Sequence, residues 1–284
     1  MAGSPNLVAA AAGTVRLGDL TVNRMGFGAM RVTGPNIWGD PPDRAAARRL
    51  LVRAVELGID FIDTADSYGP EVSERIIAEA LFPYPQGLVI GTKGGLVRPG
   101  PGRWPSDARP EHLRRALDGS LKRLRLERID LYQLHAPDPK VPYADSVGAL
   151  AEFQRAGKIR HLGVSNVSVK ELEQARRIAP IVSVQNKYNL EDRSSDNVLA
   201  ACEKAGIAFI PWFPLGAGSL LRSVKLRRVA ARHGVTSPQV ALAWLLARSR
   251  VMLPIPGTSS IAHLEENIAA AALKLGDEDL AELR

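Results

Sequence analysis

The chain of 284 residues contains one cysteine, Cys202. A single thiol cannot form an internal disulfide, and no cysteine and histidine residues have the spacing of a zinc site. We therefore expect no disulfide framework, no metal, and a reducing, cytoplasmic location. The apolar stretch at residues 7–12 is short and has no preceding basic residues, so it does not resemble a secretory signal. No apolar run reaches transmembrane length, and a membrane partner is not expected.

The charge balance is basic, with 37 lysines and arginines against 30 acidic residues and a net charge of +7. The basic residues between Leu113 and Arg128 have the spacing of one solvated face of an outer helix. This pattern argues against a nucleic-acid partner, although a positive surface can steer a phosphorylated ligand. No change in composition divides the chain, so we expect one domain over residues 1–284, with residues 1–13 mobile. The sequence does not indicate the number of subunits, and a monomer is compatible with it.

Strand and helix patterns alternate along the chain after a short hairpin at Thr14–Leu17 and Leu20–Val22. Strands are expected at Met25–Met30, Phe61–Ala65, Leu88–Lys93, Ile129–His135, His161–Asn166, Val182–Asn189, Ala208–Phe213 and Val251–Ile255. Ser168 and Glu171 form a predicted capping box at the start of one of the intervening helices. Eight strands alternating with helices predict an α/β fold, a (β/α)8 TIM barrel with an N-terminal β-hairpin. The competing open doubly wound sheet lacks its glycine-rich strand-to-helix fingerprint.

Polar or aromatic residues stand where several predicted strands end. Asp63 lies in the stretch FIDTADSYG, Lys93 ends LVIGTK, and His135 ends IDLYQLH, while Asn166 and Trp212 hold similar places. Taken singly, such an aspartate is more often a helix cap, such a lysine a surface residue, and such a histidine part of a core. Because the loops after barrel strands meet at one mouth, their shared position predicts an active site there.

Seven motifs occur in an order and spacing that resemble the aldo-keto reductase superfamily. They are DTADSYG, GTK, LYQLH, GVSN, VQNKYN, WFPLG and IPGTSSIAHLEEN, and they cover about Met25 to Asn267. With GPNIWG after the first strand, the pattern is most similar to the bacterial pyridoxal reductase branch. The resemblance implies reversible, NADPH-dependent reduction of an aldehyde or ketone to an alcohol, with pyridoxal or another aromatic aldehyde as a candidate.

The same resemblance assigns a catalytic tetrad. Tyr68 would be the general acid and base, Lys93 and Asp63 would tune it, and His135 would orient the carbonyl. An unperturbed tyrosine has a pKa of about 10 and exchanges protons poorly near neutrality. An ammonium about 4 Å away, at an effective dielectric constant near 20, contributes roughly 4 kcal/mol, so we expect Lys93 to lower the pKa of Tyr68.

The resemblance also implies the cofactor contacts. Ser165, Asn166 and Gln185 would surround the nicotinamide amide, Trp212 would stack on the ring, and Phe213 and Pro214 would also contact the cofactor. Leu215 to Ser219, which include Gly216 and Gly218, would lie along the pyrophosphate. Gly257, Thr258, Ser259, Ser260 and His263 would hold the adenosine phosphate, with Glu266 and Asn267 at the adenine. Gly257 replaces a frequent lysine and His263 a frequent arginine, so NADPH is the expected cofactor with NADH as an alternative. Substrate choice would come from loops that include Arg31–Asp40 and Gly95–Ala108, and the substrate pocket would include Met30, Trp38 and Trp104.

Two other functions are consistent with parts of this pattern. Lys93 could act as the Schiff-base nucleophile of a lyase built on the same barrel. Alternatively, the chain could bind a nucleotide without turnover, as a regulatory module. The cofactor motifs argue against the lyase, and the complete tetrad argues against the regulatory module.

Overall fold

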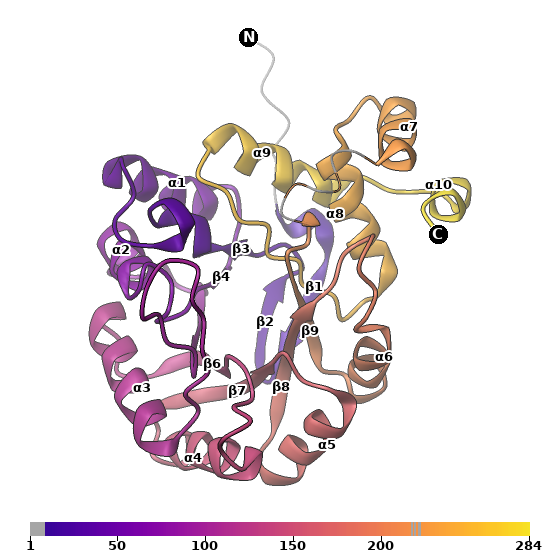
Figure 1. Ribbon diagram of the computed structural model, residues 1–284. Coiled ribbons are helices and arrows are strands. Elements are labelled where there is room, and N and C mark those ends of the chain that lie inside the picture. Colours follow the sequence, from indigo (N-terminus) through magenta and orange to yellow (C-terminus); the bar gives the residue numbers. More distant parts are fainter. Residues whose placement is uncertain (1–8, 217, 219, 221–222) are drawn as a thin grey trace.

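The computed structural model describes residues 9–216, 218, 220 and 223–284. Helices and strands alternate along most of this length (Figure 1). The strands are β1 (Thr14–Leu17), β2 (Leu20–Asn23), β3 (Phe27–Gly28), β4 (Phe61–Asp63), β5 (Val89–Gly94), β6 (Ile129–Leu134), β7 (Ile159–Ser165), β8 (Ile181–Lys187) and β9 (Ala208–Trp212). The α-helices are α1 (Arg44–Glu56), α2 (Val72–Leu81), α3 (Pro110–Leu124), α4 (Tyr143–Arg155), α5 (Val169–Ile178), α6 (Asp196–Ala205), α7 (Val224–His233), α8 (Ser237–Arg248), α9 (Ile261–Ala269) and α10 (Asp277–Glu282).

The strands β3 to β9 form one parallel sheet in sequence order, and the sheet curls into a ring with helices outside it (Figure 1). Parallel strands need crossover connections, which the helices α1 to α6 provide. The predicted TIM barrel is therefore confirmed. The separate antiparallel pair β1 and β2 is the predicted hairpin, and Figure 1 shows it in the middle of the ring.

The eighth strand position differs from the prediction. Residues 251–255 do not form a regular strand, because Pro254 and the following Pro256 have no N–H group for a ladder. The segment still closes the ring. Its residue Met252 forms an isolated parallel bridge with Phe209 of β9, and Pro254 O accepts a hydrogen bond of 2.9 Å from Gly26 N, next to β3.

The start of the barrel is also shorter than predicted. The strand expected at Met25–Met30 is limited to β3, because the chain turns at Ala29–Val32 into the 3-10 helix η2. Of the N-terminal segment expected to be mobile, residues 1–8 lie outside the described residues. Ala9–Ala12 form the 3-10 helix η1, in which Ala9 is fully buried and its N–H donates to Leu57 O.

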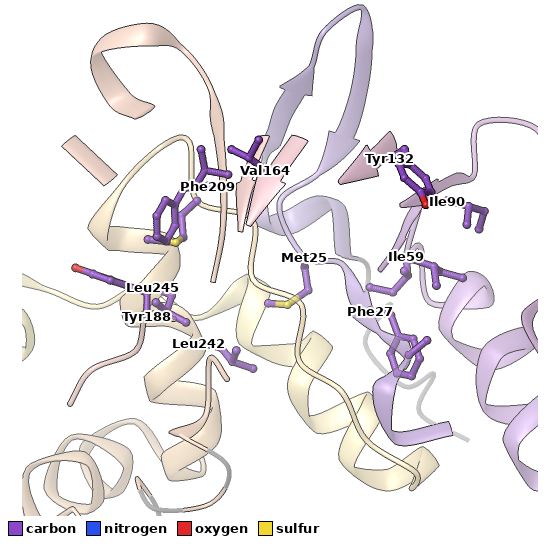
Figure 2. Packing of buried hydrophobic residues seen from close by; sticks show 14 of the residues in the cluster. Met25, Phe27, Ile59, Ile90, Tyr132, Val164, Tyr188, Phe209, Leu242 and Leu245 are labelled. Carbon is purple, nitrogen blue, oxygen red and sulfur yellow. The ribbon is translucent and has the colours of Figure 1, made fainter. Parts of the chain in front are cut away.

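Alternation along the strands produces two hydrophobic layers. Side chains that point outward, such as Ile62 and Ile90, pack under the helices in the larger core. Figure 2 shows part of it, with Tyr188, Phe209 and Leu245 close together beside α8. Inward-pointing side chains form a second cluster, which consists of Val15, Leu17, Val22, Phe61, Val89, Leu131, Ala208, Ile210, Leu253 and Ile255. The hairpin thus fills one end of the barrel with apolar side chains.

Local sequence signals account for several helix starts. Asp43 accepts a hydrogen bond from Ala46 N at the start of α1, and Ser168 with Glu171 forms the predicted capping box of α5. Such caps satisfy N–H groups that have no partner within the helix. Within the described part of the chain, no helix is both long and apolar enough to cross a bilayer.

Candidate active site

The period of two along the strands also places polar groups inside the barrel. Phe61 of β4 belongs to the apolar inner cluster, and Asp63, two residues later, points the same way at the strand's carboxyl end. In β5 the apolar Val89 is followed, four residues later, by Lys93 on the same face. An apolar floor therefore lies beneath a polar layer at the carboxyl end of the sheet.

Lys93 is the centre of this polar layer and is fully buried. Its Nζ donates to Asp63 Oδ2 at 2.7 Å, to Thr64 O at 2.8 Å and to Tyr68 Oη at 3.4 Å. The other oxygen of Asp63, Oδ1, accepts hydrogen bonds from Gln185 Nε2 at 2.8 Å and Gln133 Nε2 at 3.3 Å. Both charges are therefore paired and hydrogen-bonded, as a buried ion pair requires.

The pKa of Tyr68 shifts in the opposite direction from the prediction. Burial raises the pKa of its hydroxyl above the usual value, and the Lys93 ammonium offsets this effect only in part. We expected a net lowering, but loss of hydration around a buried oxygen outweighs one nearby positive charge that is itself neutralised by Asp63. Burial also acts to lower the pKa of Lys93, but Asp63 and Tyr68 together raise it. Lys93 is thus charged and Tyr68 protonated near neutral pH.

His135 follows β6 and completes the group. The ring centroids of His135 and Tyr68 lie 6.0 Å apart in an edge-to-face arrangement. Burial, assisted by the Lys93 charge, lowers the pKa of His135 well below its ordinary value. The imidazole is therefore neutral at pH 7 and carries one N–H donor and one acceptor nitrogen. Its Nδ1 lies 3.4 Å from Ser67 Oγ.

The four side chains lie at one end of a cavity of about 360 Å³. Asp63, Tyr68 and His135 line it directly, and Lys93 lies behind them. The rest of the lining consists of Gly28, Met30, Arg31, Ile37, Leu96, Trp104, Ser165, Asn166, Gln185, Trp212, Phe213, Pro214, Leu215, Ile255, Pro256 and Gly257. The cavity is mainly apolar with polar groups on one side, which is typical of a small-molecule site.

A second cavity, of about 520 Å³, continues from the first. The two share Arg31, Leu215 and Gly257 in their walls. The remaining wall of the second cavity is formed by Gly218, Leu220, Ser237, Pro238, Thr258, Ser259, His263, Glu266 and Asn267. Together the cavities extend from the tetrad to the N-terminus of α9, where Ser260 caps the helix by accepting from His263 N.

Hydrogen bonds order the part of the first cavity wall that contains Ser165, Asn166 and Trp212. Asn166 Nδ2 donates to His135 O at 2.9 Å and to Ser165 Oγ at 3.1 Å, and Asn166 Oδ1 accepts from Trp212 Nε1 at 3.0 Å. The backbone of Asn166 is in the left-handed region, with φ of 58°. This network fixes the Trp212 ring at the cavity wall.

The family model described as Aldo/keto reductase family matches residues 24–284. The chain belongs to this family. An uncharacterized oxidoreductase of Schizosaccharomyces pombe is 51% identical to it over 283 residues, which are 99% of this chain and 92% of that protein. Pyridoxine 4-dehydrogenase of Escherichia coli is 45% identical over 276 residues, with 95% and 96% of the two chains covered.

Among solved structures, an aldo-keto reductase from Klebsiella pneumoniae in complex with NADPH has a TM-score of 0.83 and 28% identity to this reductase. The similarity covers 95% of this chain and 93% of the other. These matches confirm the resemblance and the oxidoreductase class that the motifs predicted. The match with pyridoxine 4-dehydrogenase also supports the predicted likeness to the pyridoxal reductase branch.

Most of the residues singled out in the sequence of this reductase lie along the two cavities. Three differ. Trp38 is not among the residues lining the first cavity, and its ring centroid lies 5.5 Å from Arg98 Cζ. Gly216 and Ser260 do not line either cavity. Ala217 and Ser219, expected along the pyrophosphate, lie outside the described residues.

Sequence reasoning missed Gln133, and it covered Arg31, Ile37 and Leu96 only as parts of the two loops expected to determine substrate choice. Gln133 occurs within LYQLH, two residues before His135, and the period of two would have placed it inside the barrel. Arg31 was included in the first of these loops but was not assigned to the cofactor site, because a lone arginine is usually a surface residue. Within the residues that the structure describes, no three His, Cys, Asp or Glu side chains are grouped so that they could hold a metal ion.

Proposed function

We propose that this aldo/keto reductase reversibly reduces an aldehyde or ketone to an alcohol with NADPH, using Tyr68 as the general acid and base. The observation that carries this proposal is the contact of Lys93 Nζ with both Asp63 and Tyr68 Oη at the end of the cavity. Membership of the family and the 45% identity to pyridoxine 4-dehydrogenase support it.

The chain's own groups supply the proton. When bound, the reduced nicotinamide provides the hydride for the carbonyl carbon. Tyr68, whose raised pKa keeps it protonated, donates its hydroxyl proton to the carbonyl oxygen as that oxygen becomes negative. Lys93, 3.4 Å from the phenol, stabilises the negative charge that develops on the tyrosine oxygen. Asp63 keeps Lys93 charged and in place.

His135 orients the carbonyl in this proposal. A neutral imidazole beside Tyr68 can donate a hydrogen bond to the substrate oxygen without competing for the proton that Tyr68 delivers. A protonated His135 would place a second positive charge close to Lys93, which is part of the reason that its pKa is lowered. The tetrad thus contains one proton donor, Tyr68, and one neutral orienting group.

The two connected cavities fit a dinucleotide. The walls of the first contain the amide and hydroxyl side chains Ser165, Asn166 and Gln185 and the aromatic Trp212, which suit a nicotinamide ring. One amide N–H of Gln185 is already donated to Asp63. The second cavity ends at the N-terminus of α9, and backbone N–H groups at a helix start suit phosphate.

Arg31 supports the choice of a phosphorylated cofactor. It is exposed on the junction of the two cavities, where a pyrophosphate would need a positive charge. Near the adenosine end, His263 supplies a weaker charge than arginine would. NADPH is therefore the proposed cofactor and NADH the alternative, in line with the NADPH complex of the Klebsiella pneumoniae relative.

Pyridoxal or another aromatic aldehyde is the proposed substrate. Trp104 lines the cavity with its ring centroid 6.3 Å from that of Tyr68, at an interplanar angle of 77°. This gives the carbonyl end of the site an aromatic wall. The Schiff-base alternative is disfavoured because it needs an uncharged lysine, whereas the pKa of Lys93 is raised and its Nζ makes three hydrogen bonds.

We also propose that residues 1–284 act as one domain and that the enzyme is cytoplasmic. The family match from residue 24 to residue 284 supports the single domain. The lone, buried thiol of Cys202 supports a reducing location.

The test combines a substrate panel with one substitution. NADPH oxidation is followed with aromatic and aliphatic aldehydes, with NADH run in parallel. Tyr68→Phe should lower turnover by about 10²- to 10⁴-fold while NADPH binds as before. An unchanged rate in this variant would refute the role of Tyr68, and no oxidation with any aldehyde would favour the regulatory-module alternative.

A further inference from the structure

Two loops that carry aromatic side chains meet beside Tyr68. The first, residues 34–40, contains Trp38, which forms a parallel bridge with Gly69. The second, residues 95–107, is closed by an antiparallel bridge between Leu96 and Ser106 and carries Trp104. The first loop contains only the short 3-10 helix η3 (Pro35–Ile37), so the position of the cavity wall depends on what holds the two loops together.

Arg98 joins these loops. Its guanidinium is stacked over the Trp104 ring, with Cζ 3.6 Å from the ring centroid, and lies 5.5 Å from the centroid of Trp38. Its N–H groups donate to Ile37 O at 2.9 Å, Asn36 O at 3.3 Å and Ser67 O at 3.3 Å. Ser67 directly precedes Tyr68. One side chain thus contacts both loops and the segment that carries the proton donor.

Arg98 is almost fully buried, with 8% of the whole residue exposed, and no described carboxylate forms an ion pair with it. Burial of a charge without an opposite charge is unfavourable unless other groups replace its water. Here three backbone carbonyls accept from the two terminal nitrogens and the indole rings lie against the guanidinium, while Nε is buried without a hydrogen-bond partner among the described residues. Burying a positive charge without a counter-ion costs free energy, and proteins rarely accept this cost only to join two surface loops. The burial of Arg98 therefore indicates a role in the adjacent cavity.

The backbone that Arg98 holds is strained. Asn36 and Ile37 have φ of 57° and 58°, in the left-handed region that a β-branched residue such as isoleucine rarely adopts. The carbonyls of both residues accept from Arg98. Ile37 lines the cavity, as does Trp104. Strain of this kind persists only where surrounding contacts maintain it, and it gathers at functional sites.

We propose that Arg98 is a positioning residue that determines the preference of the enzyme for flat aromatic carbonyl substrates. It holds Trp104 and Ile37 as a fixed wall next to Tyr68, against which a planar ring can lie. The proposal rests on the reductase function proposed above. A planar guanidinium is needed because it stacks on Trp104 and bonds several carbonyls at once, which a lysine cannot do.

The test measures Arg98→Ala with benzaldehyde and with propanal. We expect KM for benzaldehyde to rise by about tenfold with kcat within about twofold, because binding of the ring is weakened in the ground state and the transition state alike. KM for propanal and the Kd of NADPH should stay within about twofold, since neither depends on the wall. Trp emission should also change, because the stack on Trp104 is lost. Arg98→Lys should behave like Arg98→Ala.

Controls separate this role from general damage. Arg103→Ala alters an exposed arginine of the same loop and should leave both KM values unchanged. In a Trp104→Ala background, Arg98→Ala should add little to KM for benzaldehyde, because the wall is already lost. Equal rises for both aldehydes, or the same effect of Arg98→Ala with and without Trp104, would overturn the proposal. If none of the aldehydes supports NADPH oxidation by the wild-type enzyme, the proposed reductase function itself is refuted.

Discussion

Replacement of Lys93 by methionine should separate the stability of the fold from the chemistry of the site. Methionine is similar in length and apolar, so the variant removes the ammonium without leaving a large cavity. Asp63 is then left charged, 2% exposed, and without its partner at 2.7 Å. Removal of one member of a buried pair costs about 3–5 kcal/mol. Because Asp63 keeps hydrogen bonds from Gln185 and Gln133, we expect about 3 kcal/mol, at the lower end of that range.

The effect on turnover follows from the contact between Lys93 Nζ and Tyr68 Oη. At 3.4 Å and an effective dielectric constant of about 20, the ammonium stabilises a full negative charge on the tyrosine oxygen by about 5 kcal/mol. A proton that is half transferred in the transition state would feel about half of this, or roughly 2.5 kcal/mol. Lys93→Met should therefore reduce turnover by roughly 70-fold.

The double variant Asp63→Asn with Lys93→Met tests both figures. Removal of both charges should restore most of the unfolding free energy, because a buried pair replaced by neutral groups is often nearly as stable. Turnover should stay low, since the charge beside Tyr68 is still missing. Urea unfolding at neutral pH and NADPH oxidation measure the two quantities. A double variant that regains turnover, or that is no more stable than Lys93→Met, would refute the reasoning.

Two further predictions concern titratable groups. The pKa of His135 is lowered in the folded state, so the unfolded chain binds the proton more readily below pH of about 6.5. Stability from neutral His135 is therefore present above this pH and lost as the pH falls, and His135→Gln should flatten urea stability between pH 6.5 and 5 by up to about 1.4 kcal/mol per pH unit. Burial raises the pKa of Cys202 to about 12, so its thiol should react with Ellman's reagent only after denaturation; rapid labelling of the native enzyme would contradict the buried position.

The sequence predicted the barrel well because its strands are bounded by abrupt changes from apolar to polar residues. It failed at the eighth strand position, where the apolar pattern of residues 251–255 was clear but Pro254 prevents a ladder. Polar residues at strand ends predicted the neighbourhood of Asp63 and Lys93, which the structure brings together. The direction in which the pKa of Tyr68 shifts could not be predicted, since it depends on how deeply the hydroxyl is buried in the folded chain.

The substrate side was predicted less well for a similar reason. Trp38 and Trp104 looked equivalent in the sequence, yet only Trp104 is among the residues lining the cavity. What distinguishes them is their position relative to Arg98, a residue of the second loop whose Cζ lies 3.6 Å from the ring centroid of Trp104 and 5.5 Å from that of Trp38. A contact between two irregular loops leaves no periodic signal in a sequence.

Pro254 and Pro256, in the segment that closes the barrel, affect the rigidity of the first cavity. Ile255, Pro256 and Gly257 all line the first cavity, so this rim is part of the site. Each pyrrolidine ring fixes φ near −65°, and the rim therefore takes its shape from covalent geometry as well as from pairing with neighbours. Such a rim is preorganised. Most of the entropy needed to order it is lost when the protein folds, and little remains to be lost when a ligand arrives.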